Sequence, residues 1–145
     1  RARALAAPLC LAVLDIDYFK NVNDAYGHVT GDRVLARIGA IAGDALRRTD
    51  FVARYGGEEF VVLMPDTEPA EAKSVLERLR EEIERSHVLA PNGTPVRVTA
   101  SVGVAALEDT DSPEQLLERA DRALYRAKSR GRNRLESGAA HPTRP

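Results

Sequence analysis

The chain has 145 residues, enough for one domain with a substantial core, and its composition excludes several classes of protein. Apolar residues make up 43% and charged residues 30%, while the formal net charge of −1 argues against binding polymeric nucleic acid or a membrane surface through bulk electrostatics. Any anionic ligand must therefore be held by a local site. Cys10 is the only cysteine, and the sequence carries neither a signal-peptide pattern nor a membrane-spanning apolar stretch. We therefore expect a cytoplasmic domain that makes no membrane contact.

The first part of the chain predicts a buried strand followed by helices. Residues 8–17 form a continuous apolar run that ends in acids, which is typical of a central strand buried on both faces. A helix is expected to begin near residues 18–20, and residues 31–48 carry apolar side chains at helical spacing. Thr30 is the expected N-cap of this second helix.

A β-hairpin is expected next. The β-rich runs at residues 50–55 and 58–65 are separated by Gly56 and Gly57. Both glycines can adopt positive φ angles, so this dipeptide predicts a two-residue turn between two antiparallel strands.

A helix and a strand follow the hairpin. Residues 67–86 predict an amphipathic helix, with Thr67 as its N-cap and Pro69 in its first turn. Residues 97–107 are rich in β-branched side chains, which favours a strand.

The last expected element is a helix over residues 112–131. Ser112 and Gln115 fit a capping box, Pro113 takes the first helical position, and Gly131 can end the helix.

This order of elements predicts an α/β fold in which helices flank a mixed sheet, of the ferredoxin-like or polymerase-palm-like kind. Residues 1–136 are expected to form the domain and residues 137–145 a disordered tail. The first seven residues read as the end of a helix, so the chain is expected to begin inside a longer protein.

Two acidic clusters carry the first functional signal. Asp15 and Asp17 stand where the first strand ends, and Glu58 and Glu59 directly follow the glycines of the turn. If the hairpin packs beside the first strand, Glu58 or Glu59 faces Asp15, and such carboxylates repel one another unless a cation lies between them. Oxygen ligands of this kind suit Mg²⁺. The alternative is a hairpin with solvated flanks; the turn alone favours it, but the acids at the end of a buried strand favour the metal site.

Three segments together resemble a known family. "LDIDYFKNVNDAYGHVTGD", "ARYGGEEF" and "ADRALYRAKSRGRN" are similar in order and spacing to the motifs of the GGDEF family, the diguanylate cyclases, over about residues 9–136. This family condenses two GTP molecules into cyclic di-GMP and releases two pyrophosphates. The resemblance implies the same activity here. Glu58 stands where the family name has an aspartate, and glutamate there is an accepted active form.

The resemblance implies a metal site made of Asp15, the Ile16 carbonyl and Glu58, holding Mg²⁺ or Mn²⁺, with two ions per active site. The ions would neutralise the leaving pyrophosphate and activate the 3′-hydroxyl that attacks the α-phosphate. Glu59 is the candidate for assisting deprotonation, although metal alone can suffice. Asp17 matches a further acid of the motif.

Other motif positions would bind the nucleotide. The glycines Gly56 and Gly57 would let the backbone approach it. Backbone N–H groups at Phe19 and Lys20 would bind phosphate oxygens. Lys20 is also predicted to be a catalytic residue.

The resemblance implies that Lys128 and Arg132 contact the γ-phosphate. The alternative is that they only offset the dipole at the end of the last helix.

Asn23 and Asp32 match the guanine-binding positions. The Asp32 carboxylate can accept hydrogen bonds from guanine N1–H and the 2-amino group, whereas ATP would leave it unpaired at a cost of about 1–3 kcal/mol. The alternative is that Asp32 caps a helix that begins near Gly31.

A second site is implied at Arg47 and Asp50, which form the only R-x-x-D sequence of the chain. Their spacing to the hairpin is similar to the family's inhibitory cyclic di-GMP site, to which Arg78 would add a second arginine. The alternative is that Arg47 offsets a helix dipole and that Arg78 is a solvated helix residue.

Our first hypothesis is therefore a diguanylate cyclase that works as a homodimer, because each domain would bind one GTP. Two alternatives stay open: a non-catalytic cyclic di-GMP receptor, and a cyclase for other nucleotides, which Asp32 opposes. The family's usual start, "D-x-L-T-G-L-x-N-R-R", is absent, so part of the guanine pocket wall is expected to be missing from this sequence.

Overall fold

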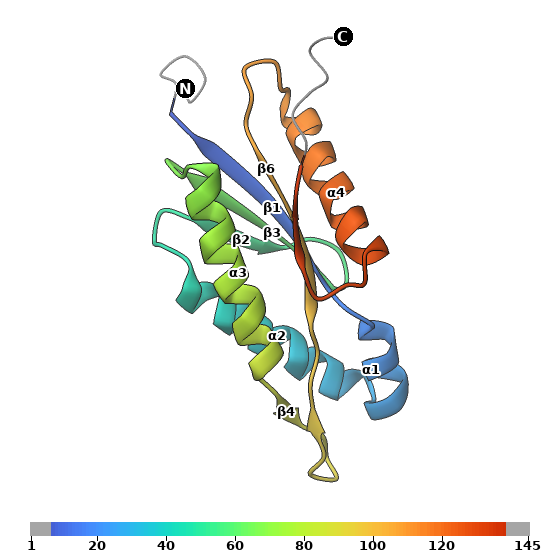
Figure 1. Cartoon of the computed structure of the whole chain (residues 1–145). Helices are drawn as coiled ribbons and strands as arrows, with labels where there is room; N and C mark the ends of the chain where they lie inside the picture. The colour runs from blue at the N-terminus through green and yellow to red at the C-terminus, as the bar shows by residue number, and fades with distance from the viewer. Residues whose placement is uncertain (1–6, 139–145) are drawn as a thin grey trace.

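The computed structural model describes residues 7–138, which fold around a five-stranded sheet with helices on both faces (Figure 1). The elements in chain order are β1 (Leu9–Ile16), α1 (Phe19–Tyr26), α2 (His28–Ala45), β2 (Phe51–Arg54), β3 (Glu59–Pro65), α3 (Pro69–Arg85), β4 (Val88–Leu89), β5 (Pro95–Val96), β6 (Ala100–Ala106), α4 (Pro113–Ser129) and β7 (Leu135–Ser137). The predicted mixed sheet flanked by helices is confirmed.

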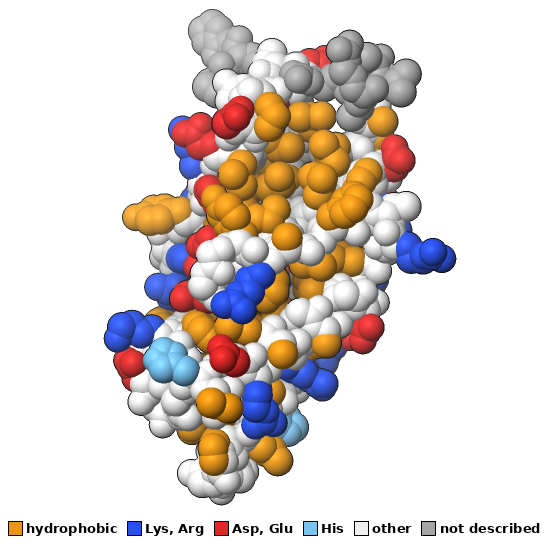
Figure 2. Space-filling view, turned by 180° about the vertical axis from the view of Figure 1, so that it is seen from behind, with side chains coloured by type: hydrophobic (Ala, Val, Ile, Leu, Met, Phe, Trp, Pro, Cys, Tyr) orange, Lys and Arg blue, Asp and Glu red, His pale blue; other side chains and the backbone are white. Residues whose placement is uncertain are grey.

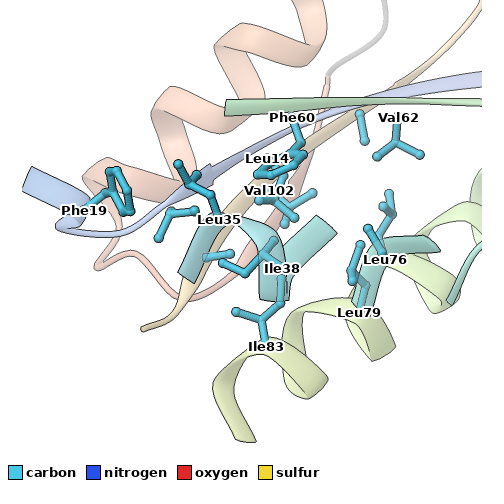
Figure 3. Packing of buried hydrophobic residues seen from close by; sticks show 14 of the residues in the cluster. Leu14, Phe19, Leu35, Ile38, Phe60, Val62, Leu76, Leu79, Ile83 and Val102 are labelled. Carbon is cyan, nitrogen blue, oxygen red and sulfur yellow. The ribbon is translucent and has the colours of Figure 1, made fainter. Parts of the chain in front are cut away.

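β1 is the central strand of the sheet, whose order is β2-β3-β1-β6-β7. It pairs antiparallel with β3 and with β6, and β7 lies parallel to β6. Alternate residues of a strand face opposite sides, so the apolar run of β1 supplies two separate cores. The larger core joins the sheet to α1, α2 and α3, and Figure 3 shows its sheet side chains facing those of α2 and α3.

The smaller core lies between the sheet and α4. Val13 of β1 and Ala105 of β6 pack there against Leu116 and Leu124 of α4. Gly103 of β6 permits this close packing, because a Cβ atom at that position would lie 2.2 Å from the backbone nitrogen of Leu124. The C-terminal turn of α4 is thereby brought over the end of β1, where the acids of the first cluster lie.

The helix caps follow the sequence only in part. The Ser112–Gln115 capping box and the N-terminal prolines of α3 and α4 are confirmed. Thr30 is not a cap, because α2 already begins at His28, after Gly27, and Thr30 is buried within the helix. Thr67 is not a cap either, because Glu68 takes that position.

The predicted two-residue turn is also wrong. β2 ends at Arg54 and β3 begins at Glu59, so residues 55–58 connect them. The N–H of Tyr55 donates to the carbonyl of Glu59 at 2.6 Å, and Gly56 has φ 86°, whereas Gly57 does not adopt a positive φ. The longer turn places Glu58 outside the strand, next to the end of β1.

Three short strands were missed. β4 and β5 form a separate two-stranded ribbon whose turn contains Gly93 at φ 85°. β7 includes Ser137, and the N–H of Gly138 donates to the carbonyl of Val104, so the predicted tail is wrong for these two residues. The rest of the predicted tail, residues 139–145, lies outside the described residues. Residues 1–6 of the helix end predicted at the N-terminus also lie outside them.

One sheet face extends beyond the area that α4 covers. Phe51, Leu63 and Leu11 are successive cross-strand partners on β2, β3 and β1, and Phe51 is 63% exposed. Seen from behind, the molecule shows many apolar side chains gathered together (Figure 2). Within residues 7–138, no helix has the length and apolar character needed to cross a membrane.

Candidate active site

The fold brings the two acidic clusters together. Asp15 and Glu59 are register partners on β1 and β3, and the N–H of Ile16 donates to the carbonyl of Glu58 at 3.2 Å. The turn therefore packs beside the end of β1, and the side chains of Asp15, Glu58 and Glu59 share one small region. Sequence reasoning predicted this meeting.

The proximity of these acids changes their acidity. Burial raises the pKa of Glu58, and the negative charge of the neighbouring Asp15 raises it further. The same two causes, in the same order, raise the pKa of Glu59. Lys128 lowers both pKa values but does not cancel the shift. The region thus carries more negative charge than the protein itself neutralises.

Lys128 is the cation nearest to this cluster. Its Nζ donates to Oδ2 of Asp15 at 2.5 Å, and the Asp15 side chain is only 5% exposed. Lys128 lies in the last turn of α4, which Gly103 allows to approach the sheet. Its role therefore extends beyond offsetting a helix dipole.

The oxygen atoms of this region fit a hard divalent cation. Asp15 and Glu58 offer carboxylates, Ile16 offers a backbone carbonyl, and Mg²⁺ or Mn²⁺ accepts such ligands together with water and phosphate oxygens. Among residues 7–138, no group of three or more His, Cys, Asp or Glu side chains is arranged to enclose a metal ion. An ion here would thus take part of its coordination from a ligand or from water.

Asp17 does not join the other acids. Its carboxylate is buried and accepts from the hydroxyls of Thr99 at 2.6 Å and Ser101 at 2.7 Å, and from the N–H of Asn133 at 3.0 Å. Sequence reasoning missed these partners. The usable signal was a pair of hydroxyl side chains at period two in an apolar strand segment, which indicates a polar group beneath it.

Arg132 lies beside the start of α1. Its guanidinium carbon lies 4.7 Å from the centroid of the Tyr18 ring, a cation–π contact. Tyr18 is the N-cap residue of α1 with φ 56°, and no side chain caps the helix. The first backbone N–H groups of α1, at Phe19 and Lys20, are therefore not engaged by a side-chain cap. The Lys20 side chain is exposed and pairs with Asp24 at 3.0 Å.

The two predicted base-binding residues lie on adjacent helices, and Asn23 of α1 lies against Gly31, the residue before Asp32 on α2. Asn23 Oδ1 on α1 is buried and has no hydrogen-bond partner among the described residues. A Cβ atom at Gly31 of α2 would lie 1.9 Å from this oxygen and 3.2 Å from the ring of Phe19. Asp32 is exposed on α2 and cannot cap that helix, which begins at His28. A buried acceptor without a partner carries a free-energy cost, which a hydrogen-bond donor from outside the described chain would relieve.

Arg47 and Asp50 lie at the other end of the hairpin and pair with each other. The backbone N–H of Arg47 donates to Asp50 Oδ2 at 2.9 Å, and its guanidinium contacts Asp50 Oδ1 at 3.2 Å. The same guanidinium donates to the Pro65 carbonyl at 2.8 Å and to the Thr67 hydroxyl. The hydrogen bond to Asp50 raises the pKa of Arg47.

Arg78 is exposed on α3. In the part of the chain that the structure describes, it forms no hydrogen bond or ion pair with Arg47 or Asp50. Its predicted association with them remains a prediction.

Known proteins resemble this chain over most of its length. A sequence profile for the diguanylate cyclase GGDEF domain matches residues 1–134. Diguanylate cyclase DgcP of Pseudomonas aeruginosa is 50% identical over 131 residues, which cover 88% of this chain and 19% of the relative. Diguanylate cyclase A of Treponema denticola is 43% identical over 128 residues, which cover 88% of this chain and 34% of the relative. The chain thus spans about a fifth to a third of the length of these relatives.

Solved structures agree with this result. The GGDEF domain of DgcB from Caulobacter crescentus, solved in complex with c-di-GMP, superposes with a TM-score of 0.90 at 37% identity and covers 94% of this chain and 81% of that one. The active GGEEF domain of a diguanylate cyclase from Vibrio cholerae gives a TM-score of 0.89 at 31% identity and covers 97% of this chain and 88% of that one. The chain therefore belongs to the GGDEF family, the diguanylate cyclases.

Proposed function

We propose that this domain condenses two GTP molecules into cyclic di-GMP and two pyrophosphates. The observation that carries the proposal is the meeting of Asp15, Glu58 and Glu59 between β1 and the hairpin turn, with an excess of negative charge. Such a cluster is stabilised when a divalent cation binds, and a triphosphate brings one with it. The structural neighbour described as an active GGEEF domain supports glutamate at the position of Glu58.

Asp15, the Ile16 carbonyl and Glu58 would hold the divalent ions. An ion bound there supplies positive charge against the departing pyrophosphate and makes the attacking 3′-hydroxyl more acidic. Glu59 would accept the proton of that hydroxyl, and its raised pKa makes it a stronger base than an ordinary carboxylate. The small side-chain volume at Gly56 and Gly57 leaves room for the nucleotide at the turn.

The triphosphate would lie between the start of α1 and the end of α4. The backbone N–H groups of Phe19 and Lys20 would bind phosphate oxygens, as helix N-termini do. Lys128 and Arg132 would contact the γ-phosphate, a proposal that the contacts of Lys128 with Asp15 and of Arg132 with Tyr18 support.

The guanine base would lie between α1 and α2. Its donors would pair with Asn23 Oδ1, which has no partner in the described chain, and with the exposed carboxylate of Asp32. Adenine lacks a matching set of donors, so selection of GTP over ATP follows from the cost of leaving these acceptors unpaired.

Two domains would have to meet face to face, because each site holds one GTP and the product joins two. The relatives extend well beyond the region that matches this chain, so segments of that kind can bring two domains together. The cyclic product would bind at Arg47 and Asp50, with Arg78, and inhibit turnover. The neighbour solved in complex with c-di-GMP supports binding of this product by domains of the family.

A receptor that binds cyclic di-GMP without making it is the second candidate, and the c-di-GMP complex of the DgcB domain is the observation that favours it. A receptor function does not explain why Asp15, Glu58 and Glu59 lie together at the hairpin turn. Turnover of GTP separates the two candidates.

The test incubates the purified domain with GTP and Mg²⁺ and measures cyclic di-GMP by chromatography. We expect product from GTP but not from ATP, none after chelation of the metal, and an initial rate that rises more than linearly with protein concentration. A domain that binds cyclic di-GMP tightly but makes none at any concentration would establish the receptor instead.

A further inference from the structure

We propose that Asp17 is a positioning residue: it holds the loop after α4 in the conformation that presents Arg132 to the triphosphate. This inference rests on the proposed cyclase function, because the ligand of Arg132 is the nucleotide. It assigns to the second aspartate of "DID" a task different from metal binding.

The hydrogen bonds of Asp17 support a positioning role. Its side chain is nine-tenths or more buried, and its Oδ2 accepts from both the Thr99 hydroxyl and the N–H of Asn133. Oδ1 accepts from the hydroxyl of Ser101. Three protein donors thus use most of the acceptor sites of the carboxylate, which leaves little capacity for a metal ion.

The loop that Asp17 contacts has an unfavourable backbone conformation. Gly131, Arg132 and Asn133 follow one another with φ angles of 120°, 66° and 47°. Residues with a Cβ atom rarely adopt positive φ, and two in succession persist only where their surroundings hold them. Asp17 contributes to this at the backbone of Asn133, directly after Arg132.

The side chain of Asn133 is held from the other side. Its Oδ1 accepts from Nη1 of Arg80 at 2.6 Å, and its Nδ2 donates to Glu84 at 3.0 Å. Both partners come from α3. Asn133 is therefore fixed at its backbone by Asp17 and at its side chain by α3.

This double attachment determines where Arg132 lies. Its guanidinium is placed over the ring of Tyr18, the residue that follows Asp17 in the sequence. Asp17 is bonded to Tyr18 in the chain and accepts from the N–H of Asn133, the residue after Arg132, while its own N–H donates to the carbonyl of Thr99. Loss of its carboxylate would remove the backbone anchor at Asn133 and loosen the position of the Arg132 side chain, although the N–H of Arg132 would still donate to the carbonyl of Ala127.

Two substitutions at Asp17 separate positioning from metal binding. In Asp17→Asn the amide oxygen can still accept from Thr99 and Asn133, while the amide NH₂ can donate to the Ser101 hydroxyl, so we expect turnover close to that of the wild type. In Asp17→Ala the loop loses its anchor, and we expect the KM for GTP to rise by about tenfold, as for a lost charge-assisted hydrogen bond. The same change in an Arg132→Ala background should have little further effect on KM, because both act through one group.

A structural readout without nucleotide makes the test independent of turnover. The NMR signal of the Arg132 Nε–H should carry the ring-current shift of Tyr18 in the wild type and in Asp17→Asn, and lose it in Asp17→Ala. If Asp17→Ala does not fold, Thr99→Val is the milder variant, and it should move the signal in the same direction. Asp111→Asn is the matched control, since Asp111 is fully buried and lies at the opposite end of α4; it should lower thermal stability without changing the KM or the signal.

Three results would overturn the proposal. Loss of turnover in Asp17→Asn as complete as in Asp15→Asn would make Asp17 a metal ligand. The effects of Asp17→Ala and Arg132→Ala on KM could simply add. The Arg132 signal could also stay unchanged in Asp17→Ala. If the wild type makes no cyclic di-GMP, the cyclase proposal fails on its own, and the NMR result still decides whether Asp17 holds Arg132.

Discussion

The two ends of the β2–β3 hairpin carry charged clusters that are balanced in opposite ways. At the turn, burial and the crowding of Asp15, Glu58 and Glu59 raise the pKa values of the two glutamates, and Lys128 opposes this shift without cancelling it. At the open end, Arg47 and Asp50 neutralise each other and share several hydrogen bonds.

This difference indicates what each region needs from a ligand. At the turn, Lys128 does not cancel the charge of the acids, and among residues 7–138 Asn23 Oδ1, beside Gly31, has no hydrogen-bond partner. Ligand binding there relieves an existing cost. The open end is already satisfied, so a ligand must replace internal bonds of Arg47. The first region suits a substrate with its cation, and the second suits a regulator that acts only at high concentration.

The largest expected effect comes from removing one charge at the turn. Glu58→Gln keeps the side-chain shape, and we expect cyclase turnover to fall by about 10²–10³-fold, the usual loss when one electrostatic contact to the transition state is removed. Thermal stability should stay the same or rise, because a repelling carboxylate has gone. Turnover assays and thermal unfolding of the same preparation measure both. Loss of activity together with a large loss of stability would mean that Glu58 is structural.

The next largest effect tests the unpaired acceptor in the base pocket. Gly31→Ala would place a methyl group against Asn23 Oδ1, so we expect the KM for GTP to rise by about tenfold or more. Gly39→Ala is the matched control on the same helix, where a Cβ atom meets nothing within 4 Å. It should stabilise the protein by about 1 kcal/mol through helix propensity and leave KM unchanged. Equal KM values for the two variants would contradict the assigned pocket.

A smaller effect is expected at the open end of the hairpin. Arg47→Ala should raise the concentration of cyclic di-GMP needed for half-inhibition by about tenfold, because one charged bidentate contact is lost, while the initial rate stays as in the wild type. Arg48→Ala, at the neighbouring exposed arginine, is the control and should leave inhibition unchanged. Inhibition that persists in Arg47→Ala would place the regulatory site elsewhere.

The smallest effect concerns pH. The pKa values of Glu58 and Glu59 are raised above their ordinary 4.5, so from pH 4.5 upward the folded protein holds more protons at these groups than the unfolded chain. These groups therefore reduce stability as the pH rises through that window, and the loss persists above it. We expect the free energy of unfolding of the wild type to fall relative to Glu58→Gln between pH 4.5 and pH 8.

Mg²⁺ should reverse this loss. At ten times its dissociation constant, a ligand of the folded state adds about 1.4 kcal/mol, and the gain should be present at pH 8 and small at pH 4.5. Denaturant titrations at both pH values measure it. A stability difference between wild type and Glu58→Gln that does not change with pH would show that neither burial nor the charge of Asp15 raises the pKa of Glu58.

Patterns that depend on local chemistry and strand pairing could be predicted from the sequence. The apolar run of β1 and the acids after the turn predicted both the central strand and the meeting of Asp15 with the hairpin. The capping box at Ser112 was equally local. The family motifs added the positions of Lys128 and Arg132, which lie at this region in the structure although they are far away in sequence.

The errors arose where tertiary packing overrides a local preference. Thr67 would make a good cap, but its hydroxyl accepts from Arg47 and donates to Pro65 instead. The glycines of the turn allow a tight hairpin, yet the register of β2 with β3, in which Arg54 lies opposite Phe60, leaves four residues between the two strands. The role of Asp17 depends on Thr99, Ser101 and Asn133, none of which is near it in the chain. The paired hydroxyls of residues 99 and 101 indicate a buried polar group, but they do not identify Asp17 as that group.

The bond between Lys128 and Asp15 has a consequence for the order of events in a reaction cycle. The ammonium group of Lys128 occupies the Asp15 carboxylate, so a free metal ion must displace it in order to bind there. We therefore expect weak affinity for Mg²⁺ added alone. When the nucleotide binds together with its ion, Lys128 can bind a phosphate oxygen of the nucleotide in place of the Asp15 carboxylate. Calorimetric titrations should therefore show cooperative uptake of ion and nucleotide, and Lys128→Met should strengthen binding of the bare ion while weakening that of the nucleotide.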